Sequence, residues 1–381
     1  MLIITGGFIY KRHASFNKPY FYISLAWFLI PLLTGYFYSV YFSSVLQFSI
    51  LIFTFPFLLF LLFSNLPNFN PALKSAIILI LCSLSIFTLI YDRKYYDEGY
   101  IALFKQNVKN IKQAKQDYGD EVLTFLDGFK DVSEHYLTKE SNSNLNWLFD
   151  FNSSKEFVSF IENNPRKKLA LACISSIPPE YIPLILNFYP VVLEKKDYFG
   201  GSYYLFSITG KEKKQIQRTI SFNDFENDYP VWNEINKNNI TDSIPVSGPF
   251  SYLINSEQEW GPSFSFDLKD HIKHRNDFLD ISVKILPMEN LEEILLVSVL
   301  ESMGKTIEWR GTPINQNEFK IQGDWIKTFQ SVKLSDITYI PNDTRVKVFI
   351  WNKSKNKFLM DDFEIKVREG NPLLYGIFEE H

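Results

Sequence analysis

The stretch FYISLAWFLIPLLTGYFYSVY, which covers Phe21–Tyr41, is the first of three apolar segments near the start of the chain. The other two are Val45–Asn65 and Ser75–Tyr91, and Lys74 is the only side chain within or between the three segments that is charged at neutral pH. A helix needs about 20 apolar residues to cross the roughly 30 Å hydrocarbon core of a bilayer. The pattern therefore predicts three transmembrane helices in residues 1–91.

The distribution of basic residues predicts how these helices are oriented. Lys11, Arg12 and Lys18 precede the first segment, whereas the loops between the segments contain Lys74 alone. Because Lys and Arg accumulate in cytoplasmic loops, we expect a cytoplasmic N-terminus, with Asp92–His381 outside the cytoplasm. The abundance of Phe, Tyr, Ile, Lys and Asn is typical of an AT-rich bacterial genome. The sequence therefore predicts a multi-pass protein of the bacterial inner (cytoplasmic) membrane, with the lipid bilayer as its first partner.

The composition of the chain argues against several classes of function. The 381 residues carry a formal net charge of −4, with Lys and Arg interspersed among Asp and Glu, so no nucleic acid is expected as a partner. The apolar segments contain no Asp, Glu, His or Arg, which argues against an ion pump or transporter. Cys82 and Cys173 define no disulfide framework. We identify no catalytic residue and no zinc signature.

Residues 92–210 predict a small extracytoplasmic α/β domain, because helical and strand-like patterns alternate there. Gly200-Gly201 lacks the spacing and the following helix of a phosphate-binding loop, and it predicts a hairpin turn. The expected helices are 92–116, 121–136, 156–163 and 178–188, and the expected strands are 168–174, 191–198 and 203–208.

Residues 211–381 predict an antiparallel β-sandwich. Val346–Ile350 and Phe363–Val367 show the period-two alternation of strands with one buried face. Short strands at regular spacing indicate a sandwich, for which we expect a jelly-roll order. The fold class is thus a multi-domain membrane protein with boundaries after residues 91 and 210. The expected strands are 264–268, 278–286, 294–301, 305–309, 325–333, 345–351 and 358–367.

Two acidic motifs mark the ends of this region. The opening strand contains NDFE (Asn223–Glu226) followed by a tryptophan, and the final strand contains DDF (Asp361–Phe363). This combination resembles the galactose-binding-like sandwiches of many carbohydrate-binding modules. The resemblance implies that the first and last strands lie together and that Glu226, with Asp361 or Asp362, binds a structural calcium ion, which takes about six to eight oxygen ligands. The alternative is a set of acidic residues on a solvated strand edge; no other cofactor is expected.

The tryptophans suggest a second kind of site, because flat aromatic faces pair with the apolar faces of pyranose rings. Large aromatic residues in a sandwich usually belong to the core, and we therefore place Trp325 and Trp351, which lie in expected strands, in the core. Trp260 and Tyr252 lie near polar turns. They are the surface candidates for contact with a glycan.

The apolar block contains a further pattern: Trp27-Phe28-Leu29-Ile30-Pro31, Tyr38-Ser39, Val45-Leu46-Gln47 and Phe55-Pro56. It resembles the late transmembrane helices of the GT-C superfamily of polyprenyl-phosphate-sugar glycosyltransferases, such as the protein mannosyltransferases and aminoarabinose transferases. The resemblance covers about residues 20–91, or 20–210 if the soluble region that follows is included. It implies a soluble extracytoplasmic region after the helices and a lipid-linked sugar as a ligand. Gln47 stands where many relatives carry Arg. The catalytic acidic residues of that family lie in a first extracytoplasmic loop without a counterpart here, so no catalytic residue is carried over.

Three functions stay open from the sequence. In the first, the chain is the C-terminal part of such a glycosyltransferase and is inactive without a membrane partner chain. In the second, it is a non-enzymatic envelope protein whose β-sandwich binds glycan. The third alternative is a membrane-anchored scaffold whose sandwich packs against other proteins.

Overall fold

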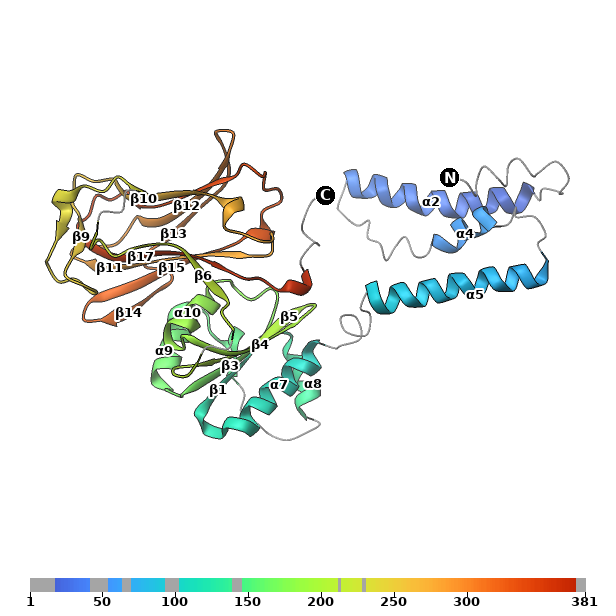
Figure 1. Cartoon of the computed structure of the whole chain (residues 1–381), viewed down its shortest axis with the longest axis horizontal. Helices are drawn as coiled ribbons and strands as arrows, with labels where there is room; N and C mark the ends of the chain where they lie inside the picture. Colours follow the sequence, from blue (N-terminus) through green and yellow to red (C-terminus); the bar gives the residue numbers. More distant parts are fainter. Residues whose placement is uncertain are drawn as a thin grey trace. The chain divides into compact units, whose positions relative to one another are not determined.

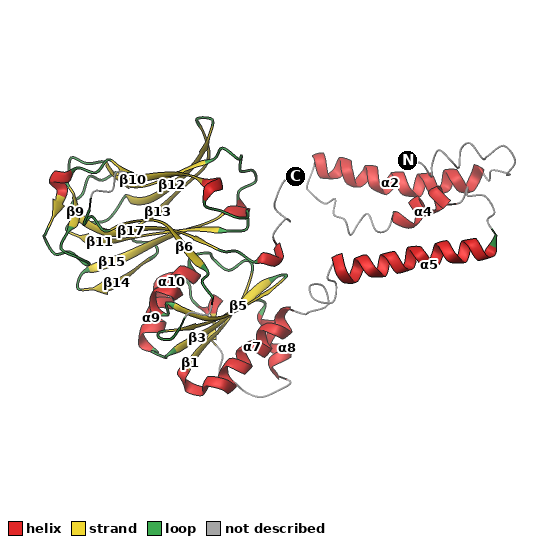
Figure 2. Cartoon of the chain, viewed as in Figure 1, coloured by secondary structure: helices red, strands yellow, loops and turns green. Residues whose placement is uncertain are grey.

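The computed structural model describes residues 18–41, 54–63, 70–92, 103–138, 146–211, 214–227 and 231–374. The chain divides into two compact units, Met1–Arg93 and Lys94–His381, which are drawn in Figures 1 and 2. The first unit is helical, and the second contains all of the strands in the described part of the chain.

The N-terminal unit contains three described α-helices: α2 (Lys18–Tyr41), α4 (Phe55–Phe63) and α5 (Pro71–Phe87), which runs into a short π-helical turn, Thr88–Asp92. The side chain of Asn70 caps α5 by accepting a hydrogen bond from the backbone N–H of Ala72 at 3.0 Å. Helices α2 and α4 are in contact, and the rings of Trp27 and Phe57 stack with centroids 5.7 Å apart.

The structure supports fewer membrane-length helices than the sequence predicts. Within the described residues, Phe21–Tyr38 of α2 is the one helical stretch that is both long and apolar enough to cross a bilayer. Helix α5 has 17 residues and α4 has 9, which is short against the requirement of about 20. Three transmembrane helices are therefore not supported; much of the second expected segment, 45–53 and 64–65, lies outside the described residues.

The first half of the C-terminal unit is an α/β arrangement around a five-stranded sheet with the order β2-β1-β3-β5-β4. Strand β1 is parallel to β2 and β3, whereas β5 is antiparallel to β3 and β4. The strands are β1 (Val122–Leu126), β2 (Asn146–Trp147), β3 (Lys168–Ile174), β4 (Val191–Tyr198) and β5 (Gly201–Ser207), and the helices are α7 (Leu103–Tyr118), α8 (Lys130–Thr138), α9 (Ser154–Asn163) and α10 (Tyr181–Phe188).

Alternation along β3 distributes the helices over both faces of this sheet. Ala170 and Ala172 belong to one buried cluster together with side chains of α7. Leu169 and Leu171 belong to another, together with side chains of α9 and α10. Successive residues of a strand point to opposite faces, so α7 covers one face and α9 with α10 covers the other.

The predicted helix 121–136 is wrong in its first half. Val122–Leu126 forms strand β1, and all five residues are buried; α8 begins only at Lys130. A strand that is buried on both faces is a continuous apolar run, and such a run cannot be distinguished from a helical segment by periodicity. The predicted hairpin is confirmed, but its turn is Phe199-Gly200, and Gly201 is the first residue of β5.

The second half of the unit consists of two antiparallel sheets packed face to face. The smaller sheet has the order β13-β12-β16-β10-β7, and the larger has the order β14-β15-β11-β17-β9-β8, with β6 also paired to β17. The strands are β6 (Gln217–Asn223), β7 (Trp232–Asn233), β8 (Ile240–Thr241), β9 (Ser251–Ile254), β10 (Trp260–Asp267), β11 (Phe278–Pro287), β12 (Ile294–Ser302), β13 (Lys305–Pro313), β14 (Glu318–Gln322), β15 (Trp325–Lys333), β16 (Arg345–Asn352) and β17 (Phe358–Arg368).

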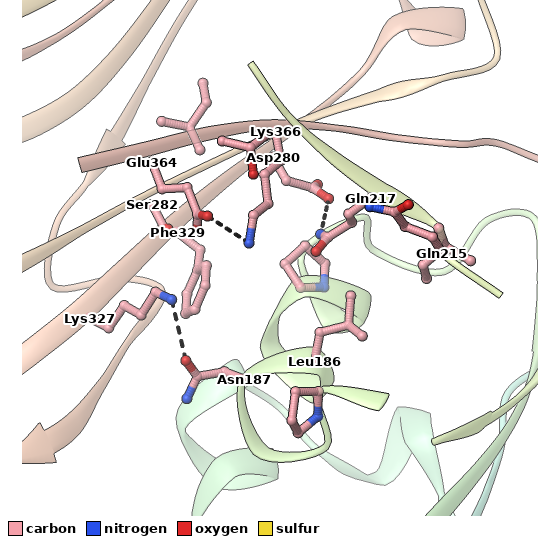
Figure 3. Close-up of a pocket in the computed structure, with 15 residues that line it drawn as sticks. Leu186, Asn187, Gln215, Gln217, Asp280, Ser282, Lys327, Phe329, Glu364 and Lys366 are labelled. Atoms are coloured by element: carbon pink, nitrogen blue, oxygen red, sulfur yellow. Dashed lines mark hydrogen bonds and ion pairs between the residues drawn. The ribbon is translucent and has the colours of Figure 1, made fainter. Parts of the chain in front are cut away.

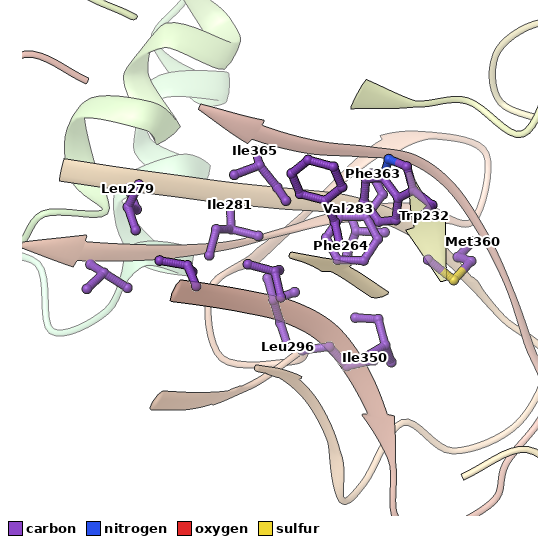
Figure 4. Close-up of a cluster of buried hydrophobic side chains, with 14 of the residues drawn as sticks. Trp232, Phe264, Leu279, Ile281, Val283, Leu296, Ile350, Met360, Phe363 and Ile365 are labelled. Atoms are coloured by element: carbon purple, nitrogen blue, oxygen red, sulfur yellow. The ribbon is translucent and has the colours of Figure 1, made fainter. Parts of the chain in front are cut away.

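The main core lies between these two sheets, and Figure 4 shows part of it. Leu279, Ile281 and Val283 enter it from β11, and Trp232 packs on Phe363 with ring centroids 4.9 Å apart. The predicted β-sandwich is confirmed, and each of the seven expected strands corresponds to an observed strand. The expected neighbourhood of the first and last strands is also confirmed, because β6 and β17 are paired.

The larger sheet lies between the smaller sheet and the α/β part (Figure 1). Phe319 of β14 and Phe329 of β15 belong to the same buried cluster as α9 and α10. Phe188 of α10 contacts Phe319 with ring centroids 5.1 Å apart. The outer face of the larger sheet is thus partly covered. Among the described residues, the buried cluster on the outer face of the smaller sheet is formed by side chains of β12 and β16.

Candidate functional site

Aromatic side chains gather on the outer face of the smaller sheet. Trp260 of β10 and Trp351 of β16 are cross-strand partners, and their rings stack with centroids 5.4 Å apart at an interplanar angle of 9°. Trp260 is 46% exposed. Beneath them Val297, Val299 and Phe349 form a small buried cluster. An exposed apolar group of this kind on a folded domain often marks a binding surface.

Trp309 of β13 extends the group on the same face. Its ring is 49% exposed and perpendicular to Trp351, with centroids 6.4 Å apart. It lies directly over Gly311, where a methyl group added to the glycine would overlap the indole. The missing side chain at Gly311 therefore lets one ring face rest on the strand and turns the other away from the sheet. We call Trp260, Trp309 and Trp351 the tryptophan face.

Polar side chains border the tryptophan face. The indole N–H of Trp351 donates a hydrogen bond to Oε1 of Glu259 at 3.2 Å. The ammonium of Lys347 lies 5.4 Å from the ring centre of Phe349 and 3.7 Å from the carboxylate of Glu234. A flat apolar platform with charged groups at its edge can contact a ring that is apolar on its face and polar at its rim.

The structure places the two predicted surface aromatics differently. Trp260 is exposed, but Tyr252 is completely buried in the main core. The hydroxyl of Tyr252 accepts hydrogen bonds from the backbone N–H of Asn236 at 3.1 Å and from Nε2 of Gln258 at 3.2 Å. Its phenol is therefore a satisfied core group, and it cannot contact a glycan.

The assignment of two tryptophans to the core is half right. Trp325 is buried, and its indole N–H donates to the backbone oxygen of Ile244 at 3.2 Å. Trp351 instead lies on the outer face. The alternation of β16 carries the signal for this: Val346, Val348 and Ile350 enter the main core, so Lys347, Phe349 and Trp351 share the opposite face. Trp309 is one of the tryptophans that the sequence offers for such a platform, but β13 has no alternation that would have singled it out.

The structure brings the three predicted calcium ligands to one loop, residues 246–250. Asp361 is buried, and its Oδ2 accepts the backbone N–H groups of Val246 and Ser247, each at 3.2 Å. The Ser247 hydroxyl donates to Oδ1 of Asp362 at 2.7 Å. Oε1 of Glu226 accepts the backbone N–H of Phe250 at 2.9 Å. Backbone and hydroxyl donors of a single loop thus occupy oxygens of all three carboxylates.

The other oxygens of Asp361 and Asp362 also have partners in the arrangement described, and a calcium site here stays a prediction. The second oxygen of Asp361 accepts the backbone N–H of Asp362 at 2.7 Å, and the second oxygen of Asp362 forms an ion pair with the ammonium of Lys284. Burial, and then the neighbouring Asp362 carboxylate, raise the pKa of Asp361 to about 6. Among the described residues, no group of three or more His, Cys, Asp or Glu side chains is placed to hold a metal.

In the described part of the N-terminal unit, the residues that are charged at neutral pH are Lys18, Lys74 and Asp92. Gln47, the position of interest in the transferase resemblance, lies outside the described residues. Pro31 and Trp27 are both within α2. The relation to the GT-C superfamily stays a prediction.

The described sandwich has structural neighbours among carbohydrate-binding modules. The "CBM22-1 xylan-binding domain from Paenibacillus barcinonensis Xyn10C" is 18% identical, with 41% of this chain and 99% of that chain covered and a TM-score of 0.29. The C-terminal family 22 carbohydrate-binding module of Clostridium thermocellum Xyn10B gives 14% identity, 40% and 96% coverage and a TM-score of 0.27. A "non-crystalline cellulose specific" module, CBM28, is 15% identical, with 39% of this chain and 89% of that chain covered and a TM-score of 0.23. At these scores the likeness decides nothing about what this chain binds.

No model of a known protein family matches the chain, and no curated protein matches it.

Proposed function

We propose that this chain is a membrane-attached, non-enzymatic envelope protein that binds glycan on the tryptophan face of its β-sandwich. The observation that carries the proposal is the pair of exposed indoles, Trp260 and Trp309, placed around Trp351 on the outer face of the smaller sheet. Membrane attachment rests on the apolar stretch Phe21–Tyr38 of α2. The extracytoplasmic position of the sandwich rests on the basic residues that precede this helix.

The geometry of the tryptophan face favours a sugar over a flat apolar ligand. Trp260 and Trp309 lie on opposite sides of Trp351, and the Trp309 ring is perpendicular to the Trp351 ring. Two differently oriented platforms suit successive rings of an oligosaccharide, which are rotated relative to one another. Glu259 and Lys347 at the border offer one acceptor and one donor for hydroxyl groups.

The sandwich scaffold and the transferase remnant are the competing proposals. A scaffold that binds protein would also use exposed tryptophans, because these residues are enriched at interfaces. The scaffold and the glycan-binding protein differ in the ligand of the tryptophan face, which is a protein for the first and a glycan for the second. A transferase remnant would instead depend on residues 20–91 and on a partner chain, and substitutions on the sandwich would leave its sugar donor bound.

The test uses the full chain in lipid nanodiscs on a glycan array, with soluble xylan and non-crystalline cellulose as added probes. We expect binding that Trp260→Ala and Trp309→Ala each weaken roughly tenfold, since the loss of an aromatic contact of about 1.5 kcal/mol has that effect. Tyr339→Ala, which removes an aromatic residue that is 55% exposed at a different site, is the matched control and should bind as the unaltered chain does.

Two results would overturn this proposal. One is the absence of binding to any glycan by a chain whose thermal unfolding shows it to be folded. The other is binding that both tryptophan substitutions leave unchanged.

A further inference from the structure

A cavity of about 460 Å³ lies on the other side of the sandwich, where α10 faces the outer surface of the larger sheet. Figure 3 shows Leu186 and Asn187 of α10 on one wall and Lys327, Phe329 and Glu364 of the sheet on the other. Its size is in the range of small-molecule sites, about 300–1,000 Å³. It is separate from the tryptophan face, because the two lie on opposite sheets of the sandwich.

Lys327 is the cation of this cavity that lacks a counter-charge. Its ammonium donates to Oδ1 of Asn187 at 3.3 Å and lies 5.3 Å from the centre of the Phe329 ring. Among the described residues no carboxylate oxygen lies within 4 Å of it. Burial, the largest effect, lowers the pKa of Lys327 to about 8, so the side chain is still mostly protonated at neutral pH. A half-buried charge without an ionic partner is costly, and an anion in the cavity would relieve that cost.

The other charges around Lys327 are already paired. Lys366 forms an ion pair with Glu364 at 2.8 Å, and Lys284 pairs with Asp362. These four groups are the charged neighbours that act on Lys327 from β11 and β17. On the facing helix α10, the group that meets Lys327 is the neutral amide of Asn187.

The remaining acidic group of the wall, Asp280, is also neutralised. Its carboxylate accepts Nε of Arg368 at 2.7 Å and Nε2 of Gln217 at 2.9 Å. Because the paired charges cancel, the charge of Lys327 gives the cavity a net charge of +1. A ligand with one negative charge balances this single positive charge, whereas a dianion would leave an excess negative charge beside Glu364 and Asp280.

We propose that this cavity binds an acidic sugar, with its carboxylate on Lys327 and its hydroxyl groups on the neutral side chains of the wall. Asn187, Gln217 and Ser282 supply amide and hydroxyl groups for those contacts. Leu186 and Pro190, which line the same cavity and are not buried, supply an apolar surface for the ring of the sugar. The inference does not depend on glycan binding at the tryptophan face.

The test is titration calorimetry of the full chain in nanodiscs with glucuronate, and with glucose as the neutral ligand of matched shape. We expect glucuronate to bind and glucose to bind at least about tenfold more weakly, because glucose cannot compensate Lys327. Lys327→Met should abolish the difference between the affinities for glucuronate and glucose. Lys320→Met, which removes an exposed lysine from the adjacent strand β14, should leave it unchanged.

The unaltered chain provides a second measurement that needs no variant. Glucuronate stays ionised above pH 5, so its affinity should fall about tenfold between pH 7 and pH 9 as Lys327 loses its proton. Trp260→Ala and Trp309→Ala should leave the affinity for glucuronate unchanged, which separates this site from the tryptophan face. The proposal is overturned by equal affinities for glucuronate and glucose, by tighter binding of glucose 6-phosphate, by a pH-independent affinity, or by no binding at millimolar ligand.

Discussion

Arg368 and Asp280 form a buried two-point ion pair on neighbouring strands of the larger sheet. Nε and one terminal nitrogen of the guanidinium lie 2.7 and 3.1 Å from the two carboxylate oxygens, and the side chains are only 3% and 5% exposed. The same terminal nitrogen donates to the backbone oxygen of Pro179 at 2.9 Å. One guanidinium thus connects the last strand of the sandwich to the loop that precedes α10.

This pair yields the first prediction. Arg368→Met leaves the Asp280 carboxylate buried without a counter-charge and should lower the free energy of unfolding by about 3–5 kcal/mol. The double variant Arg368→Met/Asp280→Leu should lose clearly less than the sum of the two single changes, because neither charge is then left alone. Urea unfolding followed by tryptophan fluorescence measures both. Additive losses would show that the pair is not coupled.

Gly311→Ala should weaken glycan binding without removing any aromatic group. The added methyl overlaps the indole of Trp309, which must rotate off the strand. We expect the affinity to fall severalfold while the free energy of unfolding changes by less than about 1 kcal/mol, because the displaced ring is at the surface. Glycan binding and thermal unfolding of the same preparation give the two values. Thr306→Ala, at an exposed position of the same strand β13, is the control and should change neither value.

Lys327→Met should change the pH dependence of stability. The pKa of Lys327 falls from 10.5 to about 8 in the folded chain, so between these pH values the unfolded chain holds more protons and stability rises with pH. The variant should lose this rise and be more stable at pH 7, by about 2 kcal/mol. The free energy of unfolding at pH 7, 8, 9 and 10 tests both statements, with Lys320→Met as the exposed control. A variant with the same slope as the unaltered chain would contradict the assigned role of Lys327.

We expect Lys284 to determine whether calcium stabilises the folded chain. Its ammonium occupies Asp362, and backbone N–H groups occupy Asp361, so calcium should leave the melting temperature of the unaltered chain unchanged. Lys284→Met removes the resident cation, leaves two adjacent carboxylates, and should create a melting temperature that rises with calcium. A rise of several degrees in the unaltered chain would instead support the calcium site that the resemblance implies for Glu226, Asp361 and Asp362.

The sandwich could be predicted from the sequence because several of its longer strands place apolar core residues at every second position. β16 is an example: Val346, Val348 and Ile350 alternate with Lys347 and Phe349, and the alternation alone separates the core from the outer face. The short strands β7 and β8 have two residues each, too few to form a pattern. β1 was missed because a strand with two buried faces does not alternate.

The site could be predicted only in part. Trp260 was found because it lies beside a polar turn, but its partner Trp351 comes from a strand far along the chain and becomes a neighbour only through the register of β10 and β16. The Lys327 cavity has the same origin. It forms where β15 meets α10, two segments that share no local signal, and its missing counter-charge is a property of three-dimensional packing.

The aromatic cluster that Phe319 and Phe329 share with α9 and α10 also bears on how this protein can have been assembled. A sandwich whose core is completely buried by its own residues can be transferred between unrelated proteins as an independent domain. This sandwich would carry an open apolar surface into any new setting, because α10 completes the covering of β14 and β15. We therefore expect the two parts of the C-terminal unit to be inherited together, and deletion of residues 103–210 to produce an aggregating sandwich.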